Sequence, residues 1–271
     1  MLIPSKRRRP TAGTVALAAL LALATPFASA APVLAADSGP VTSFDAKQRA
    51  DIEKIVRDYL IANPDILVEV SSALQKRQEV AAEEAQKDVI KAQSDTLLHS
   101  KNQVVLGNPQ GDVTLVEFFD YNCGYCRRAV EDTFALIDQD PKLRVVLKEF
   151  PILTEGSVEA ARVAIAVKDV APDRYAEFHR AMFAMKGQAD GKRALQVAEK
   201  LGIDGSKLEA AMKGPDVEDT LQETHNLAQL LQISGTPSYI IGDAVLPGAV
   251  GVAALKERID TVRKCGGTST C

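Results

Sequence analysis

Two cysteines, Cys123 and Cys126, are separated by a Gly-Tyr dipeptide. The apolar, β-branched and aromatic run 113–119 predicts a buried strand before them, and the spacing of apolar residues in 127–136 predicts a helix after them. The unpaired N–H groups and the dipole at a helix N-terminus favour negative charge, and therefore the thiolate form of a cysteine. We predict dithiol–disulfide chemistry, with Cys123 as the exposed nucleophile and Cys126, one turn into the helix, as its resolving partner.

Two other interpretations of the cysteines are weaker. The pair could form half of a zinc site with Cys265 and Cys271, but the five residues between those two differ from the usual zinc-knuckle spacing. A permanent disulfide between Cys123 and Cys126 would close a loop too short to constrain the unfolded chain much. Cys265 and Cys271 flank a flexible tail, and we predict a peripheral structural disulfide there; a free thiol and a second redox pair are the alternatives.

A copper site is a further alternative, because His179, Met182 and Met185 share one face of a predicted helix. Methionine and histidine on the inner face of a helix more often pack in a core, and we favour that interpretation. We therefore predict neither a metal ion nor a cofactor.

The predicted elements around the cysteine pair form an α/β pattern. A strand, a helix and a second strand of this length predict a βαβ unit with parallel strands. A long helical stretch follows, and then a hairpin with a two-residue turn and a closing amphipathic helix. The strands are expected at 103–106, 113–119, 143–150, 238–241 and 244–246, the helical insertion at about 155–232 and the closing helix around 252–262.

The first 30 residues have the pattern of a secretory signal peptide. A basic cluster at 6–9 precedes a short apolar run at 15–24 and a small-residue cleavage site at 28–30. The apolar run is shorter than the roughly 20 residues that span a bilayer, which disfavours the alternative of a membrane anchor. We expect residues 31–42 to be a disordered leader, and we expect export to the periplasm, where disulfides persist.

Removal of the signal peptide makes the chain more acidic. Residues 1–30 contain four basic residues and no acidic one, so the formal net charge changes from −4 to −8. An acidic chain of this kind argues against nucleic acid or an anionic lipid surface as a partner.

Residues 43–100 predict an N-terminal helical segment. Ser43 is the expected cap of a helix at about 45–62, which Asn63-Pro64 would end. Leu67, Val70 and Leu74 then follow at helical spacing, before a charged, alanine-rich stretch at 75–91. Short amphipathic helices bury little by themselves, so we favour an oligomerisation stalk. A solvated helical linker is the alternative.

The layout of residues 103–264, with Cys-Gly-Tyr-Cys in place, resembles the DsbA-type disulfide oxidoreductases, which have a thioredoxin fold with a helical insertion. The resemblance implies a buried acid at Glu117, a lysine partner for that acid at Lys148, and a cis-proline at Thr236-Pro237 that faces the cysteines. A buried carboxylate is costly unless it is paired, and Glu117 could relay the proton of a shielded Cys126. Thr236 and Pro237 would present backbone groups to the substrate.

Two features of the resemblance bear on the direction of the reaction. Gly124 and Tyr125, together with Thr236, resemble the disulfide isomerases more than the strong oxidases. The N-terminal segment resembles the stalk of the ScsC proteins, which can assemble as trimers and set several catalytic domains around one substrate.

We therefore expect a thioredoxin fold at 101–265, a stalk at 43–100 and a flexible tail at 266–271. The predicted function is that of a periplasmic thiol–disulfide oxidoreductase, as an oligomeric isomerase or reductase that acts on misfolded secreted proteins with disulfides and is kept reduced by a membrane redox partner. A monomeric DsbA-like oxidase is the first alternative. A non-catalytic chaperone or copper carrier on the same fold is the second.

Overall fold

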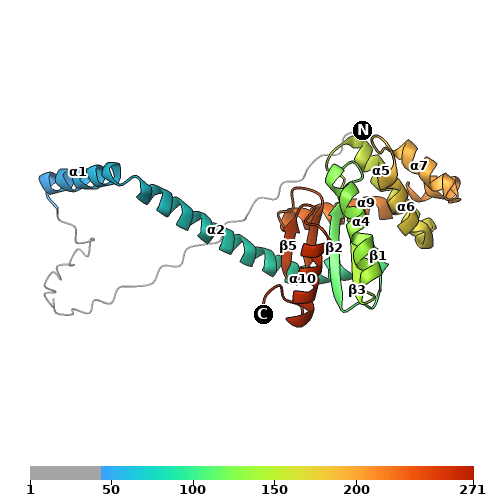
Figure 1. Ribbon diagram of the computed structural model, residues 1–271. Helices are drawn as coiled ribbons and strands as arrows, with labels where there is room; N and C mark the ends of the chain where they lie inside the picture. Colours follow the sequence, from blue (N-terminus) through green and yellow to red (C-terminus); the bar gives the residue numbers. More distant parts are fainter. Residues whose placement is uncertain (1–43) are drawn as a thin grey trace, which may run out of the picture. The chain divides into compact units, whose positions relative to one another are not determined.

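The computed structural model describes residues 44–271 (Figure 1). The expected signal peptide at 1–30 and the expected leader at 31–42 lie outside these residues. The chain divides into two compact units, one ending at Asn63 and the other beginning at Pro64.

Helix α1 (Ala46–Ala62) belongs to the first unit. Its N-cap is Asp45 rather than the expected Ser43, which lies outside the described residues: Asp45 Oδ1 accepts the N–H of Gln48 at 2.8 Å, and Gln48 Oε1 accepts the N–H of Asp45 at 2.9 Å. This reciprocal capping box satisfies two of the N–H groups that a helix start leaves unpaired. Within the described residues, no side chain of α1 is buried.

Helix α2 (Asp65–Ala92) opens the second unit as one continuous helix of 28 residues. All side chains from 67 to 85 are exposed, and Gln86 is the first after them to be half-buried. Ile90 is buried, as is Leu97 on the short helix α3 (Ser94–His99) that follows. The C-terminal end of α2 is therefore part of the packed domain, whereas its N-terminal two-thirds is not covered by the rest of this unit.

A mixed five-stranded sheet forms the centre of the domain. Its strands, in the spatial order β1-β3-β2-β4-β5, are β1 (Val104–Gly107), β3 (Leu143–Glu149), β2 (Val113–Phe119), β4 (Ser238–Ile241) and β5 (Ala244–Pro247). β2 and β3 are parallel, as expected for the predicted βαβ unit, and the other neighbours are antiparallel. Gly242 and Asp243 form the two-residue turn of the β4–β5 hairpin, and Gly242 has φ +62°.

The sheet is covered on both faces. Alternate residues of β2 enter two hydrophobic clusters: Leu115 and Phe119 belong to one, and Val116 and Phe118 belong to the other. The first cluster includes residues of α4 (Gly124–Gln139), α10 (Val252–Lys264) and the part of the helical insertion before α9 (Pro215–Leu230), and the second includes residues of α2, α3 and α9. This helix–sheet–helix layering explains why all seven residues of β3 are buried.

The helical insertion lies between β3 and β4. It contains α5 (Glu155–Val170), the 3₁₀ turn η1 (Pro172–Arg174), α6 (Tyr175–Ala184), α7 (Gly191–Lys200), α8 (Gly205–Ala211) and α9. Figure 1 shows α5, α6 and α7 grouped together. Among the helices of residues 44–271, none combines the length and the apolar character needed to cross a membrane.

Candidate active site

The two cysteines of the Cys-Gly-Tyr-Cys segment lie where β2 gives way to α4. Cys123 is the N-cap of α4, and its Sγ accepts the N–H of Cys126 at 3.1 Å. Both side chains are thiols rather than a disulfide. The N-cap position directs the unpaired N–H groups of the first helical turn at the Cys123 sulfur, which favours its thiolate.

The surroundings separate the acidities of the two thiols. The largest effect on Cys123 is a hydrogen bond with the Cys126 side chain, which lowers the pKa of Cys123. The backbone N–H groups of Tyr125 and Cys126 act in the same direction, and burial opposes them. The resulting pKa of Cys123 is about 6. Burial is the largest effect on Cys126 and raises the pKa of that thiol. At neutral pH, Cys123 is therefore the thiolate and Cys126 keeps its proton.

Cys123 is less accessible than the sequence predicts. Cys123 is only 5% exposed, and Cys126 is fully buried. The Cys123 Sγ lies 3.1 Å from the carbonyl oxygen of Thr236, to which it donates when it is protonated, and the Thr236–Pro237 peptide bond is cis. The expected exposed nucleophile is thus a sulfur partly covered by the loop that precedes β4.

Glu117 lies on β2 in the same hydrophobic layer as the cysteines. It is 2% exposed, and its Oε2 accepts the hydroxyl of Thr133 on α4 at 2.8 Å. Burial raises the pKa of Glu117 to about 7, and the nearby charges of Asp132 and Cys123 act in the same direction. Near neutral pH, Glu117 can therefore both accept and donate a proton.

The predicted pairing of Glu117 with Lys148 is wrong. Glu117 lies opposite Leu147 on β3, whereas Lys148 lies opposite Phe118, so the two charged side chains point to opposite faces of the sheet. Lys148 Nζ donates to Glu223 Oε1 at 3.1 Å and to the carbonyl oxygen of Thr96 at 2.8 Å. Lys148 therefore ties α3 and α9 to the sheet, away from the cysteines.

Sequence reasoning missed Asp120, which shapes the loop before Cys123. Asp120 is 1% exposed, its Oδ1 accepts the N–H of Asn122, and its Oδ2 accepts the N–H groups of Ile152 and Leu153 at 2.9 and 3.0 Å. The available signal was the position of an aspartate between a strand and a helix, where this residue type often bonds to nearby backbone.

Asn122, also missed, ties the same loop to the helical insertion. Its Nδ2 donates to Thr154, Ser157 and the carbonyl oxygen of Ala189, while its Oδ1 accepts the N–H of Ala189 at 2.6 Å. These contacts hold the residue next to Cys123 from two separate segments of the chain.

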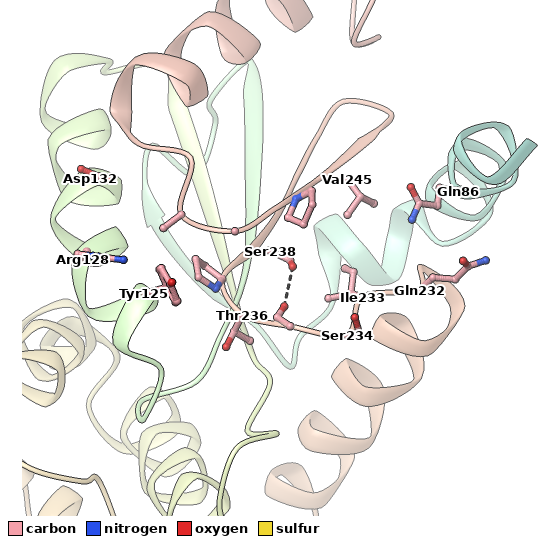
Figure 2. Close-up of a pocket in the computed structure, with 15 residues that line it drawn as sticks. Gln86, Tyr125, Arg128, Asp132, Gln232, Ile233, Ser234, Thr236, Ser238 and Val245 are labelled. Carbon is pink, nitrogen blue, oxygen red and sulfur yellow. Dashed lines mark hydrogen bonds between the residues drawn. The ribbon is translucent and has the colours of Figure 1, made fainter. Parts of the chain in front are cut away.

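A groove with a volume of about 710 Å³ begins beside the cysteine pair. Figure 2 shows Tyr125 and Arg128 of α4 at one side of it, the Ile233–Ser238 segment along its floor, and Gln86 of α2 at the far side. Tyr125 is exposed, and the guanidinium of Arg128 lies 4.6 Å from the centre of its ring. The groove is large enough for a ligand of several residues.

The other predicted sites lie elsewhere. Cys265 and Cys271 are joined in a disulfide near the C-terminus. His179 and Met182 are buried, and His179 Nδ1 is 3.1 Å from the hydroxyl of Tyr121, within an aromatic cluster. Within residues 44–271, no three His, Cys, Asp or Glu side chains gather closely enough to hold a metal ion.

A thiolate at a helix start, a second buried thiol one turn on and a cis-proline beside them are the parts of a dithiol exchange site on a thioredoxin fold. The family comparison agrees with this class, because residues 114–260 match the DSBA-like thioredoxin domain. The chain belongs to this family of DsbA-like thiol–disulfide oxidoreductases. Residues 48–81 match a second model, the N-terminal domain of the copper resistance protein ScsC, which fits a helical segment before the thioredoxin fold.

Individual relatives show the same relationship. A thioredoxin-like oxidoreductase from Silicibacter pomeroyi DSS-3 is 44% identical, with a TM-score of 0.60 over 63% of this chain and 97% of that one. A Proteus mirabilis ScsC with a linker deletion and an N6K mutation is 25% identical, with a TM-score of 0.63 over 83% of this chain and 99% of that one. The thiol:disulfide interchange protein DsbA of Bordetella pertussis is 25% identical over 52% of this chain and 68% of its own length.

One further match is to a much longer protein. The Na(+)/H(+) antiporter NhaA 1 of Salinispora arenicola is 26% identical over 157 residues, which are 57% of this chain and 24% of the antiporter. The chain thus spans about a quarter of that relative's length.

Proposed function

We propose that the Cys-Gly-Tyr-Cys segment exchanges disulfides with protein substrates, and the observation that carries this proposal is the divergent acidity of its two thiols. The Cys123 thiolate attacks one sulfur of a substrate disulfide, and the other substrate sulfur leaves as a thiolate. The product is a mixed disulfide between Cys123 and the substrate.

Cys126 then completes the exchange. Its sulfur attacks Cys123 Sγ, the Cys123–Cys126 disulfide forms, and the second substrate sulfur leaves as a thiolate. Before that attack the Cys126 proton must be removed, and Glu117, with its pKa raised to about 7 by burial, is the proposed acceptor. The substrate has gained two electrons, and the enzyme must be reduced again before the next turnover.

Gly124, Tyr125, Thr236 and Pro237 border the attacking sulfur and are the proposed substrate contacts. The Thr236 carbonyl oxygen already lies 3.1 Å from Cys123 Sγ, so a substrate strand that pairs with this loop would bring its sulfur to the thiolate. Proximity of this kind lowers the entropic cost of the attack.

The N-terminal helices are the proposed oligomerisation segment. On α1, the apolar side chains Ile52, Ile55, Val56 and Tyr59 follow helical spacing on one face and are all exposed within the described chain. On α2, Leu67, Val70 and Leu74 are likewise exposed. An exposed apolar face on a helix is typical of a protein–protein interface, and equivalent helices of other copies would bury the face of each helix. The resemblance to the ScsC proteins suggests three copies.

An oligomer suits isomerisation. One catalytic domain can hold a misfolded chain while another attacks it, because tethered domains act at high effective concentration. We therefore propose a periplasmic disulfide isomerase or reductase, directed there by the signal peptide at 1–30, that acts on misfolded secreted proteins and is kept reduced by a membrane redox partner.

A DsbA-like oxidase is the alternative that one observation favours. A low Cys123 pKa stabilises the reduced enzyme, and a dithiol protein whose reduced form is stabilised is a stronger oxidant. In that role the partner would reoxidise the cysteines rather than reduce them.

Refolding of ribonuclease with scrambled disulfides in glutathione buffer distinguishes the two roles. We compare the mature protein with Ile55→Asp, which puts a carboxylate in the apolar face of α1, and with Ala50→Asp as a control for the added charge at an exposed position off that face. The expected result is that the mature protein and Ala50→Asp are oligomers by light scattering and restore activity, whereas Ile55→Asp is a monomer and does not.

If the mature protein is a monomer that rapidly oxidises reduced ribonuclease and fails to unscramble it, the isomerase proposal is wrong and the oxidase alternative stands. If Cys123→Ala leaves every activity unchanged, the chemistry itself is elsewhere.

A further inference from the structure

Helix α2 meets the catalytic domain at the groove beside the cysteine pair. Every side chain from 67 to 85 is exposed, and Gln86 is the first half-buried side chain after them. Gln86 lines the groove together with Val245 of β5, and α2 packs against β5. The helix that leads from the proposed oligomerisation segment thus contributes directly to the wall of the groove (Figure 2).

One hydrogen bond fixes this contact. Gln86 Nε2 donates to the carbonyl oxygen of Leu231 at 2.9 Å across 145 positions of sequence. Leu231 is the C-cap of α9, and its carbonyl is among those that a helix end leaves without an intrahelical partner. Gln86 therefore satisfies an acceptor that would otherwise need water.

The bonded turn leads into the substrate loop. Gln232, the next residue, has φ +56°, a left-handed conformation that is uncommon for a residue with a side chain. The chain then runs from Ile233 through Thr236 and Pro237 along the groove floor. Gln86 thus holds the turn where this floor begins, at the opposite end from Cys123.

The lining suits one kind of occupant. Tyr125, Ile233, Pro237 and Val245 are apolar residues of the lining, and only Arg128 and Asp132 on α4 are charged among the groove residues. An extended peptide with apolar side chains matches such a surface, because its backbone can pair with the floor while its side chains enter the apolar parts. A small disulfide would occupy only the end at Cys123, Thr236 and Pro237.

We propose that Gln86 is a positioning residue that makes α2 one wall of a groove for an extended, apolar segment next to the disulfide of a protein substrate. This inference rests on the proposed disulfide exchange. It goes beyond that function because it makes the N-terminal helix part of substrate binding and links the docking of α2 to occupancy of the groove.

The test compares Gln86→Glu with Gln78→Glu in the full mature protein. Both changes keep the side-chain size and add one negative charge to α2, but only Gln86 bonds to the domain, and a carboxylate cannot donate to the Leu231 carbonyl. The first substrate is a ten-residue peptide with one cysteine in a mixed disulfide and apolar residues on both sides of that cysteine. The second substrate is oxidised glutathione.

For Gln86→Glu we expect kcat/KM for the peptide to fall about fivefold, because KM rises while kcat stays the same. A change of this size corresponds to the loss of one net hydrogen bond. The Gln86→Glu rate with glutathione and the Gln78→Glu rates with both substrates should match the unmodified protein. A purely structural role for Gln86 would lower the unfolding temperature without separating the two substrates. If Gln86→Glu does not fold, Gln86→Ala replaces it.

Two outcomes would overturn the inference: equal peptide rates for Gln86→Glu and Gln78→Glu, or an equal loss on peptide and on glutathione in Gln86→Glu. If the protein exchanges no disulfide at all, the proposed function fails separately. Fluorescence anisotropy with the same peptide, reduced and alkylated, then tests whether Gln86 supports peptide binding in the groove. Unchanged peptide affinity in Gln86→Glu refutes this role, and weaker binding in that variant alone supports it.

Discussion

The chain carries two cysteine pairs at opposite kinds of helix end. Cys123 is the N-cap of α4, whereas Cys265 is the C-cap of α10. The first pair consists of two thiols, and the second is a disulfide to Cys271. Helix N-termini stabilise a thiolate and helix C-termini destabilise it, because the dipole reverses. The same residue type therefore meets opposite electrostatic surroundings in one protein.

Neighbouring groups widen this difference. Cys123 has the Cys126 thiol and two backbone N–H groups around its sulfur, and these hydrogen bonds lower the pKa of Cys123. The C-terminal disulfide is anchored through the N–H of Ser269, which donates to Asp243 on the β4–β5 turn at 2.6 Å. Reactivity thus follows from what surrounds a cysteine pair, and the C-terminal pair has the surroundings of a structural link.

Replacement of Cys123 by alanine should remove all disulfide exchange. The thiolate is the attacking group, and the Cys126 thiol that remains is fully buried and has its pKa raised by burial. Insulin reduction with dithiothreitol measures this, and the expected rate is that of dithiothreitol alone. Exchange that persists in Cys123→Ala and disappears in Cys265→Ser would reverse the assignment of the two pairs.

Replacement of Cys126 by alanine should trap the substrate and also change the acidity of Cys123. Without the resolving thiol, a mixed disulfide with Cys123 should accumulate and be visible on non-reducing gels. The hydrogen bond with the Cys126 side chain is the largest effect that lowers the pKa of Cys123 to about 6. Alkylation of Cys123 by iodoacetamide should therefore be half-maximal near pH 6 in the unmodified protein and at higher pH in Cys126→Ala. Identical midpoints would show that the helix start alone sets the acidity.

Local patterns explain why much of this arrangement can be predicted from the sequence. The apolar run of β2, the Gly242-Asp243 turn and the helical spacing around Cys126 each depend on residues close in the chain. The resemblance to the DsbA-type proteins predicted the cis peptide bond before Pro237, which the structure has. The sequence alone indicates only a proline at the start of a strand.

The errors arise from long-range contacts. Whether Lys148 faces Glu117 depends on the register of β2 and β3, and a shift of one residue exchanges the two faces of a strand. The cover over Cys123 comes from Thr236, 113 positions later. Gln86 was part of a charged, alanine-rich stretch with no local signal, and its partner Leu231 is 145 positions away. Single-sequence patterns do not report such pairings.

A change of Glu117 to glutamine should slow the release step and stabilise the fold at high pH. The glutamine cannot accept the Cys126 proton, so resolution of the mixed disulfide should slow by about 100-fold, the lower range for general base catalysis. Quenched-flow trapping of the mixed disulfide measures that rate. An unchanged rate would exclude the relay and leave Cys126 to lose its proton to water.

The stability effect of the same substitution follows from the raised pKa. Burial raises the pKa of Glu117 from 4.5 to about 7, so the folded state holds this proton more tightly than the unfolded state. The associated stability is fully present below pH 4.5 and is lost as the pH rises through 7. Glutamine cannot ionise, so Glu117→Gln should be more stable than the unmodified protein at pH 8, by up to about 3 kcal/mol. Urea unfolding at pH 5 and pH 8 measures the difference, which should be small at the lower pH.

The smallest redox effect is expected for the C-terminal pair. In Cys265→Ser with Cys271→Ser, insulin reduction should stay within about twofold of the unmodified rate, because neither cysteine lines the groove and both are held in their own disulfide. The free energy of unfolding should fall by about 2 kcal/mol, since the disulfide closes only a short loop in the unfolded chain. Denaturant unfolding of the double variant, beside unmodified protein with its C-terminal disulfide intact, gives the second value. A large loss of reduction rate with unchanged stability would mean that the C-terminal pair takes part in electron transfer, and the contrast between helix start and helix end would no longer separate reactive from structural cysteines.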